Sequence, residues 1–293
     1  MTKIGKALAK FNLGRVATQL EEAAKDSIRL AAAEPCKEAV SRLGGRPNLP
    51  RDVEWPESKE GPLAFVAQLD LGSMPRIREF GLPLAGSLFF FYSGNDSPTK
   101  PADRKMFRVL YIDSALDGIR ERSFPKELDS KLRWQGFRFE AQKEVSFPWP
   151  EDTIVRQLNL SKDESGSFWE FSSYWLEQQS QLRTLHRVGG YPNYVQHDPK
   201  FEAHLKTTGL WAEIWKKGKL DAMAYFQETN RRFAEARQRE GHRAAEWELL
   251  LQVDSEEANG MMWGDAGHLY FLMRRDDLQA RRWEKAWMIW DCY

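Results

Sequence analysis

The amino-acid sequence predicts an α+β fold with two pseudo-symmetric antiparallel-sheet halves produced by internal duplication, flanking helices and a helical insertion in the second half. Four short blocks occur twice in the same order, and the fourth match is weaker than the others. The matched blocks are 43–48 (LGGRPN) with 188–193 (VGGYPN), 65–70 (FVAQLD) with 249–254 (LLLQVD), 86–90 (GSLFF) with 267–271 (GHLYF), and 106–113 with 284–291. Self-similarity over a long period predicts an architecture of packed copies. We therefore expect two copies of one three-stranded unit.

The spacing between the copies locates the insertion. It is 145 residues for the first pair of blocks (Leu43 to Val188) and 184, 181 and 178 for the next three. One insertion between Asn193 and Leu249 explains the change. Within it, residues 200–245 alternate in charge sign around apolar positions, which predicts two amphipathic helices with solvated outer faces.

The strands of the first copy are expected at 62–70, 87–92 and 107–113. Each is an apolar and aromatic run bounded by Gly, Pro or Asp. Their short connections favour antiparallel pairing, because parallel strands need a long crossover. Strand-like alternation also occurs within 125–150, at Phe137, Phe139 and Val145.

Helices are expected before each Gly-Gly turn, at 16–34 and 167–186, because apolar residues recur there at helical spacing. Between the first turn and the first strand lies a stretch rich in Pro and Gly, which predicts irregular extended backbone. We therefore divide the chain into an N-terminal helical segment (1–35), a first half (36–165) and a second half (166–293).

Composition limits the classes of function. The 293 residues are 42% hydrophobic and 29% charged, which is ordinary for a soluble globular protein. The 43 basic residues equal the 43 acidic ones, which argues against direct binding to nucleic acid. Charged residues interrupt the first thirty positions and no apolar run reaches eighteen residues, so neither a signal peptide nor a membrane span is expected. We expect a cytoplasmic protein with no membrane partner.

A search for catalytic and cofactor motifs identifies none. Cys36 and Cys292 lie far apart and are expected to be free thiols. The histidines lack the spacing of a metal site, and the Gly-Gly turns are not followed by the residues of a phosphate-binding loop. The sequence therefore predicts no catalytic residues, no metal and no cofactor, and the protein is not expected to be an enzyme.

Two Gln-x-Asp pairs are the most informative polar residues: Gln68 with Asp70, and Gln252 with Asp254. Residues two apart on a strand share one face, and buried polar side chains need partners. In the structural interpretation, which we favour, each pair hydrogen-bonds the neighbouring Gly-Gly turn. In the functional interpretation, both pairs line a cleft between the halves.

A turn in the second half, residues 263–267 (WGDAG), has no counterpart in the first. Glycines around an aspartate and a tryptophan would present Trp263 and Asp265 beside the second Gln-x-Asp strand. A feature found in one half alone is a candidate for specialised function. A turn-forming Asp flanked by Gly explains it equally well.

Taken together, the two Gly-Gly-x-Pro turns, the two Gln-x-Asp strands, the 263–267 turn and the closing residues 290–293 (WDCY) resemble the YwqG-like family, a bacterial domain family of unknown function. The resemblance runs from about residue 36 to the C-terminus. It implies an α+β fold with antiparallel sheet and a cytoplasmic location, but no catalytic residues. Genes for such proteins often lie beside secreted polymorphic toxins, which implies an immunity role for some members.

Two functions remain open. In the first, the protein binds and neutralises a cognate antibacterial toxin, such as a secreted nuclease of an interbacterial competition system, through acidic residues and an aromatic anchor. The candidate partner-binding residues are Asp254, Glu256, Glu257, Trp263, Asp265, Asp276 and Asp277. In the second, the protein binds a small molecule or peptide, or acts as an enzyme, in the cleft between the halves, using Gln252, Asp254, Trp263 and Asp265.

Overall fold

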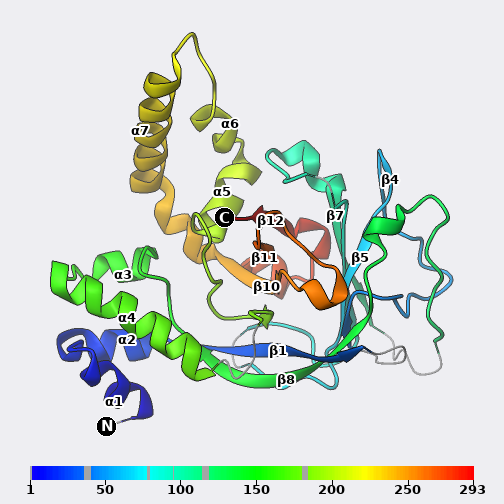
Figure 1. Cartoon of the computed structure of the whole chain (residues 1–293), viewed down its shortest axis with the longest axis horizontal. Coiled ribbons are helices and arrows are strands. Elements are labelled where there is room, and N and C mark those ends of the chain that lie inside the picture. Colours follow the sequence, from blue (N-terminus) through cyan, green and yellow to red (C-terminus); the bar gives the residue numbers. More distant parts are fainter. Residues whose placement is uncertain (1, 36–40, 78–79, 95, 114–118, 180–183) are drawn as a thin grey trace.

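A computed structural model describes residues 2–35, 41–77, 80–94, 96–113, 119–179 and 184–293. Its α-helices are α1 (Lys3–Lys10), α2 (Ala17–Ala23), α3 (Thr153–Gln157), α4 (Lys162–Gln179), α5 (Pro199–Thr208), α6 (Leu210–Ile214), α7 (Ala222–Glu240) and α8 (Arg275–Gln279). Its strands are β1 (Lys25–Pro35), β2 (Arg42–Leu43), β3 (Glu57–Ser58), β4 (Gly61–Pro62), β5 (Ala64–Asp70), β6 (Ser87–Tyr92), β7 (Phe107–Ile112), β8 (Phe137–Ser146), β9 (Arg187–Val188), β10 (Trp247–Asp254), β11 (His268–Arg274) and β12 (Trp287–Asp291). The predicted mixture of helices and antiparallel sheet is confirmed (Figure 1).

One ten-stranded antiparallel sheet organises the molecule, in the order β12-β11-β10-β9-β1-β8-β2-β5-β6-β7. The long strands β1 and β8 pair at its centre. Outward from this pair the chain adds β2, β5, β6 and β7 on one side and β9, β10, β11 and β12 on the other. The pairings of β5 with β6 and of β10 with β11 each shift register once, between Phe65 and Ala67 and between Leu249 and Leu251. These positions correspond in the matched sequence blocks.

The sheet curves strongly, so that its two ends meet across the main hydrophobic core (Figure 1). Phe90 of β6 contacts Phe271 of β11 with ring centroids 5.0 Å apart, and Phe107 of β7 contacts Trp287 of β12 at 5.5 Å. Arg104 Nη1 also links the two ends of the sheet, by donating to the carbonyl of Ala286 at 2.9 Å. The aromatic residues are therefore used mainly to fill a core shared by both ends of the sheet.

Smaller cores cover the outside of this sheet. The Pro- and Gly-rich stretch after the first turn lies over β5 and β6, where Trp55 packs against Phe91 at 5.5 Å and donates to the carbonyl of Leu63 at 2.9 Å. Helices α1 and α2 pack against α3 and α4 through Leu8, Leu20 and other buried apolar residues. The Pro- and Gly-rich stretch, which was predicted to be irregular extended backbone, thus covers the outer face of β5 and β6.

The helix expected at 16–34 is wrong beyond its first two turns, and the segment 1–35 is not wholly helical. Helix α2 ends at Ala23, and Lys25–Pro35 forms the central strand β1. Ile28 and Leu30 belong to the main core, whereas Arg29 between them is bound to Glu144. Pairing with strands on both sides has overridden the helical propensity of the alanines, because tertiary context outweighs propensity.

Other boundaries also differ from expectation. The helix expected at 167–186 is α4, which begins at Lys162 and ends at Gln179, so the proposed boundary at 165/166 falls inside it. The insertion holds three α-helices where two were expected. The first, α5, is buried against β10, β11 and β12, whereas α6 and α7 project away from the sheet as an arm (Figure 1). None of the helices in the described part of the chain combines the length and apolarity required to cross a bilayer.

Candidate functional site

The two Gly-Gly turns are held by the same set of hydrogen bonds. In the first, Arg42 donates to the carbonyl of Arg46 at 3.0 Å and to Asn48 Oδ1 at 2.7 Å, and Gln68 Oε1 accepts from Asn48 N at 2.8 Å. Gln68 Nε2 completes the set by donating to Asn48 Oδ1 at 3.3 Å. The turn itself needs left-handed backbone at Gly45 (φ 72°), which glycine adopts without strain.

In the second turn, Arg187 donates to the carbonyl of Tyr191 at 2.8 Å and to Asn193 Oδ1 at 3.1 Å. Gln252 Oε1 accepts from Asn193 N at 2.9 Å, and its Nε2 donates to Asn193 Oδ1 at 3.0 Å. Both glutamines are fully buried. The structural interpretation of the Gln-x-Asp pairs is therefore confirmed for Gln68 and Gln252, which fix the Gly-Gly turns and do not line an open cleft.

The arginine of the second turn belongs to a larger buried ion pair. The Glu144 carboxylate on β8 binds both Arg187 and Arg29, with Arg29 Nε 3.0 Å away. Burial opposes ionisation, but the two guanidinium groups hold the pKa of Glu144 below its ordinary value. In the first turn, Arg42 binds Glu121. Arg42 and Arg187 were not identified from the sequence, although each lies two residues before a Gly-Gly pair and that position was a usable signal.

The aspartates of the two pairs have different surroundings. Asp70 N–H donates to Ser41 Oγ at 2.8 Å, and its Oδ1 accepts from Gly72 N at 3.1 Å, so this carboxylate organises a turn. Asp254 N–H donates instead to His186 Nδ1 at 3.0 Å, and its Oδ1 lies 2.9 Å from His268 Nδ1. Ser41 and His186, at equivalent positions just before the matched blocks, therefore each accept a hydrogen bond from the backbone N–H of the aspartate.

The histidine-aspartate group is mostly buried. Burial lowers the pKa of His186 to about 4, so its ring is neutral near pH 7. Burial opposes ionisation of Asp254 as well, but the hydrogen bond with His268 holds the pKa of the carboxyl below its ordinary value. Both histidines are buried. The two rings are therefore closed off from solvent, whereas the Asp254 carboxylate is partly exposed.

The turn at 263–267 places its two predicted residues differently. Trp263 is buried, packs against Trp134 at 5.2 Å and donates through Nε1 to the carbonyl of Asp254 at 3.1 Å. It is part of the core and cannot be a surface anchor, which corrects the prediction for this residue. Asp265 is exposed, and its carbonyl accepts from Tyr293 N at 3.3 Å.

The remaining acidic candidates make separate local contacts. The Glu256 carboxylate lies 4.0 Å from His186 Nε2, and Glu257 is exposed at the start of a short 3-10 helix. Asp277 on α8 pairs with Arg282 at 2.7 Å, and Asp276 beside it is exposed. Within the described residues, no group of three or more His, Cys, Asp or Glu side chains is arranged to hold a metal ion.

An open cleft lies elsewhere, between α7, the segment 149–157 and the chain that follows the second Gly-Gly turn. Its volume is about 920 Å³, and Trp149, Trp169, Tyr194, Phe233 and Arg237 are among the side chains that line it. The segment 149–157 falls in the predicted first half and α7 in the second. The Gln-x-Asp pairs do not line this cleft, and the expected cleft between two halves stays a prediction.

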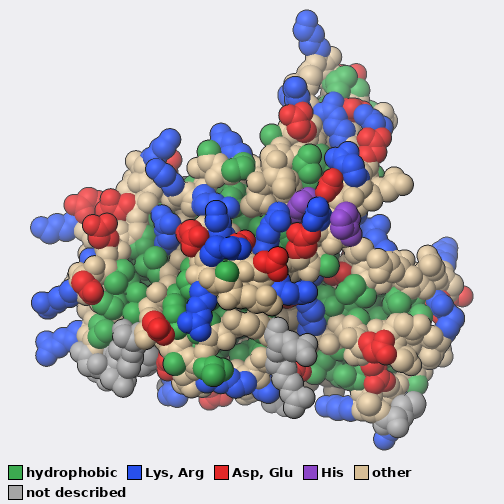
Figure 2. Space-filling model, turned by 180° about the vertical axis from the view of Figure 1, so that it is seen from behind, with side chains coloured by type: hydrophobic (Ala, Val, Ile, Leu, Met, Phe, Trp, Pro, Cys, Tyr) green, Lys and Arg blue, Asp and Glu red, His purple; other side chains and the backbone are tan. Residues whose placement is uncertain are grey.

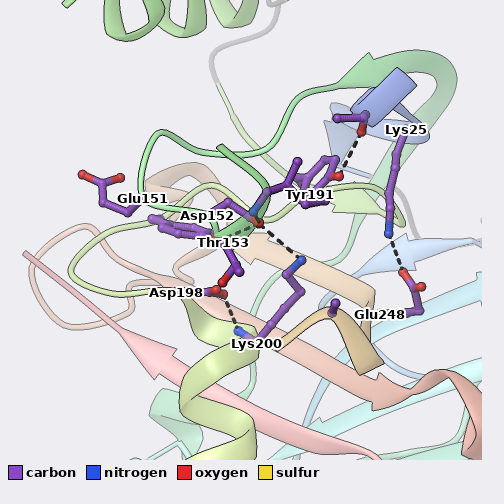
Figure 3. Close-up of polar contacts among 12 residues, drawn as sticks. Lys25, Glu151, Asp152, Thr153, Tyr191, Asp198, Lys200 and Glu248 are labelled. Atoms are coloured by element: carbon purple, nitrogen blue, oxygen red, sulfur yellow. Dashed lines mark hydrogen bonds and ion pairs between the residues drawn. The ribbon is translucent and has the colours of Figure 1, made fainter. Parts of the chain in front are cut away.

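A buried polar cluster lies beside this cleft, and its members Tyr194 and Asp198 also line the cleft. Figure 3 shows the contacts of Asp152, Asp198 and Lys200 in this cluster. Asp152 caps the N-terminus of α3 by accepting from Ile154 N at 3.0 Å, and Asp198 caps α5 by accepting from Lys200 N at 2.9 Å. The Lys200 ammonium lies 3.5 Å from Asp152 Oδ2, which also accepts from Tyr194 O–H at 3.2 Å. Two helix ends therefore converge on one lysine.

The charges of this cluster compensate one another. Burial opposes the charge of Lys200, but Asp152 and Asp198 raise the pKa of its ammonium above the ordinary value. Lys200 is therefore protonated at neutral pH and cannot act as an amine nucleophile. Burial, opposed by Lys200, raises the pKa of the Asp198 carboxyl. The cluster joins the start of α3 to the start of α5 beside the cleft.

Tyr191 connects the same network to Lys25. Its ring faces the ammonium groups of Lys200 and Lys25, whose Nζ atoms lie 4.9 Å and 5.2 Å from the ring centroid. Lys25 in turn pairs with Glu248 at 3.2 Å, and the Tyr191 hydroxyl donates to the carbonyl of Ala23 at 2.9 Å (Figure 3). The second Gly-Gly turn is thereby tied to the strand β1 and to α5.

The family to which the chain belongs follows from its sequence match. Residues 41–292 match the model of a domain of unknown function, DUF1963. No curated protein matches the chain. The matched region contains both Gly-Gly turns, both Gln-x-Asp strands and every residue that lines the cleft except Tyr293, and it covers most of the sequence. The chain belongs to the DUF1963 family.

Proposed function

We propose that this protein is an immunity protein that binds and neutralises a cognate antibacterial toxin, such as a secreted nuclease of an interbacterial competition system. The observation that supports a protein partner is the arm formed by α6 and α7, which carries large apolar side chains in solvent. We call Trp215, Leu220, Met223 and Phe226 the arm tip. Met223 is 66% exposed and Phe226 is 63% exposed. Such a concentration of exposed apolar side chains is typical of a protein interface.

The arm is built to hold this tip in place. The Tyr225 hydroxyl donates to the carbonyl of Trp215 at 3.1 Å, and Arg232 Nη1 donates to the carbonyl of Lys216 at 3.1 Å. Met223 and Phe226 are three residues apart on α7 and so lie on one face of the helix. A pre-organised apolar surface loses little conformational entropy on binding, which favours affinity.

The loop between α6 and α7 is basic on balance, since it contains Lys216, Lys217 and Lys219 against one acid, Asp221. In Figure 2 green, blue and red side chains are mixed on the projecting arm. We infer that the arm contacts an apolar and acidic surface of the toxin. The exposed acids Glu257, Asp265 and Asp276 remain candidates for a second contact with a basic region of the toxin.

The test is co-expression with the product of the neighbouring toxin gene. We expect the full chain to protect cells and to co-elute with the toxin on a sizing column. The double variant Met223→Glu/Phe226→Glu should weaken the complex by at least about a hundredfold, since each buried apolar side chain contributes roughly 1.5–3 kcal/mol. Leu84→Glu, which alters an exposed apolar residue elsewhere, should bind as the wild type does.

Each contrary outcome has a definite meaning. Absence of both protection and complex formation would remove the immunity proposal. A complex that survives the arm-tip variant but is lost in Glu257→Gln/Asp265→Asn would transfer the contact to the acidic residues. Circular dichroism of every variant checks that the fold is retained.

Three finer statements belong to the same proposal. We infer an internal duplication, supported by the matched sequence blocks, by the order of the strands on either side of β1 and β8, and by the equivalent hydrogen bonds of Arg42 and Arg187. We infer that the YwqG-like name applies to this member of the DUF1963 family. A cytoplasmic location would suit a protein that intercepts a toxin after its delivery.

A second candidate function, binding of a small molecule or peptide or catalysis, is favoured by the open cleft beside the Asp152–Lys200 cluster. It uses none of Gln252, Asp254, Trp263 and Asp265, because the cleft is lined by other residues. A thermal-shift screen against a metabolite panel tests it. Stabilisation that is lost in Trp169→Ala would support this function, and a silent screen would count against it.

A further inference from the structure

We propose that the cleft between α7 and the segment 149–157 binds a small molecule that combines a planar nitrogen heterocycle with an anionic group, either a phosphate or a carboxylate. This inference is independent of the immunity proposal, because it uses neither the arm tip nor the exposed acids. The volume of the cleft, about 920 Å³, lies within the range of small-molecule sites.

Aromatic side chains from several elements supply the surface for a ring. Trp149 and Trp169 contact each other edge to face with centroids 5.1 Å apart, and Trp149 also lies 6.1 Å from Tyr194. Trp169 is 42% exposed, an unusual state for so large an apolar side chain. On α7 Phe233 lies 4.8 Å from the ring of His197. These rings offer stacking and edge contacts to a flat ligand.

Two guanidinium groups converge in the same cleft. Arg156 Nε and Arg237 Nη1 both donate to the carbonyl oxygen of Glu151, at 3.0 Å and 3.1 Å. The Arg237 guanidinium is further held over the rings of Phe201 and Phe233, at 5.1 Å and 5.6 Å. Paired guanidinium groups with fixed planes are suited to binding carboxylate or phosphate.

Buried polar atoms in the cleft lack partners among the described residues. Arg237 Nε has no hydrogen-bond acceptor, and Glu151 Oε2 has no donor. Both atoms are covered by protein, and a buried polar atom left unpaired is costly, so a ligand that accepts and donates would be favoured if these two side chains rotate toward the cleft that they line. An anionic group would accept from Arg237, and a ring N–H would donate to Glu151.

The other acids near the cleft do not cancel this preference. Asp152 is paired with Lys200, and Asp198 accepts from Lys200 N at the start of α5. Glu151 is therefore the acid with an unpaired carboxylate oxygen, and its backbone carbonyl holds both arginines. The cleft should favour an anionic heterocycle over its uncharged analogue.

Isothermal titration calorimetry with four probes tests the proposal on the full chain. The anionic probes are adenosine monophosphate and indole-3-acetate, and the uncharged controls are adenosine and indole. We expect one anionic probe to bind at least about tenfold more tightly than its control, as one charge-assisted hydrogen bond implies. Preference for adenosine monophosphate would assign a nucleotide, and preference for indole-3-acetate an aromatic carboxylate.

Variants locate the binding. Arg156→Gln, at an exposed position, and Trp169→Ala should each weaken the preferred probe about tenfold or more. Two control variants should bind the probe as the wild type does. They are Arg239→Gln, on α7 but outside the cleft, and the single substitution Met223→Glu in the arm tip. No binding of either anion at about 1 mM, equal binding of charged and uncharged probes, or binding unaffected by Arg156→Gln and Trp169→Ala would each overturn the proposal.

Discussion

The two Gly-Gly turns differ in how deeply their charged partner is buried, although their hydrogen bonds to Asn and Gln are the same. The carboxylate that binds Arg187 belongs to Glu144, whose side chain is 4% exposed and which also binds Arg29. The carboxylate that binds Arg42 belongs to Glu121, whose side chain is 28% exposed. One turn is therefore held by a buried charge triad near the centre of the sheet, and the other by a single, partly hydrated ion pair.

This difference matters because water can replace a partner in one place and not in the other. Removing one member of a buried ion pair leaves an uncompensated charge, whereas a partly exposed charge recovers hydration. The second turn should therefore be the more fragile, although it also supports the cleft. Four predictions test the comparison in order of decreasing effect.

Glu144→Gln should have the largest effect. It leaves Arg29 and Arg187 buried without a carboxylate, which we expect to cost about 3–5 kcal/mol in the free energy of unfolding. Urea denaturation followed by tryptophan fluorescence at pH 7 measures it. An effect below about 1 kcal/mol would mean that the triad is hydrated in solution.

Gln252→Leu should cost about 3 kcal/mol. It leaves Asn193 N–H and the carbonyl of Leu185 unpaired, and each unsatisfied buried group costs roughly 1–3 kcal/mol. Gln68→Leu is the matched variant in the first turn, where Asn48 N–H loses its acceptor. Equal losses in the two variants would show that the glutamines are equivalent and that the turns differ through their carboxylates alone.

Acidification should weaken the protein through His186. Because burial lowers the pKa of His186 from 6.5 to about 4, the unfolded chain takes up the proton first as the pH falls. The stabilisation is complete above pH 6.5 and is lost toward pH 4, and about 2 kcal/mol should be gone by pH 5. Urea denaturation at pH 7 and pH 5 measures it.

The first turn supplies the control for this pH effect. Ser41 occupies the position of His186 and accepts from Asp70 N–H, so His186→Ser copies an arrangement that the molecule already contains. The difference in stability between pH 7 and pH 5 should shrink by about 2 kcal/mol in His186→Ser. An unchanged pH dependence would assign the loss to other groups.

Glu121→Gln should have the smallest effect, about 1 kcal/mol or less, because this carboxylate is partly hydrated and Arg42 keeps its bonds to Asn48 and to the carbonyl of Arg46. Urea denaturation under the conditions used for Glu144→Gln allows direct comparison. A loss as large as that of Glu144→Gln would contradict the distinction between the two turns.

Local sequence patterns predicted the outer strands and the role of the glutamines. β5, β6 and β7, and the strands of the matching blocks, are short apolar runs bounded by turn residues, so periodicity and punctuation suffice to find them. Gln68 and Gln252 stood out because a polar residue on an apolar strand requires a partner. Both inferences depend only on residue types and spacings within one short segment of the sequence.

The missed features depend on residues far apart in the sequence. The alanines of Lys25–Pro35 favour a helix, and the strand forms because β8 and β9 flank it. Trp263 was predicted to be an aromatic anchor for a partner protein, but it packs against Trp134 in the core. The cleft combines the segment 149–157 with α7, and no local pattern brings those together. Position before a Gly-Gly pair could have revealed Arg42 and Arg187.

The location of β1 has a consequence for where this domain can be cut. The region shared with the family begins at residue 41, yet the strand that joins the two sides of the sheet is Lys25–Pro35. A fragment trimmed to the family limits would expose the backbone donors and acceptors of β8 and β9, which is a template for aggregation. The smallest unit expected to fold alone therefore starts before Lys25, and an expression trial comparing the two starting points would reveal it as the yield of monomeric protein.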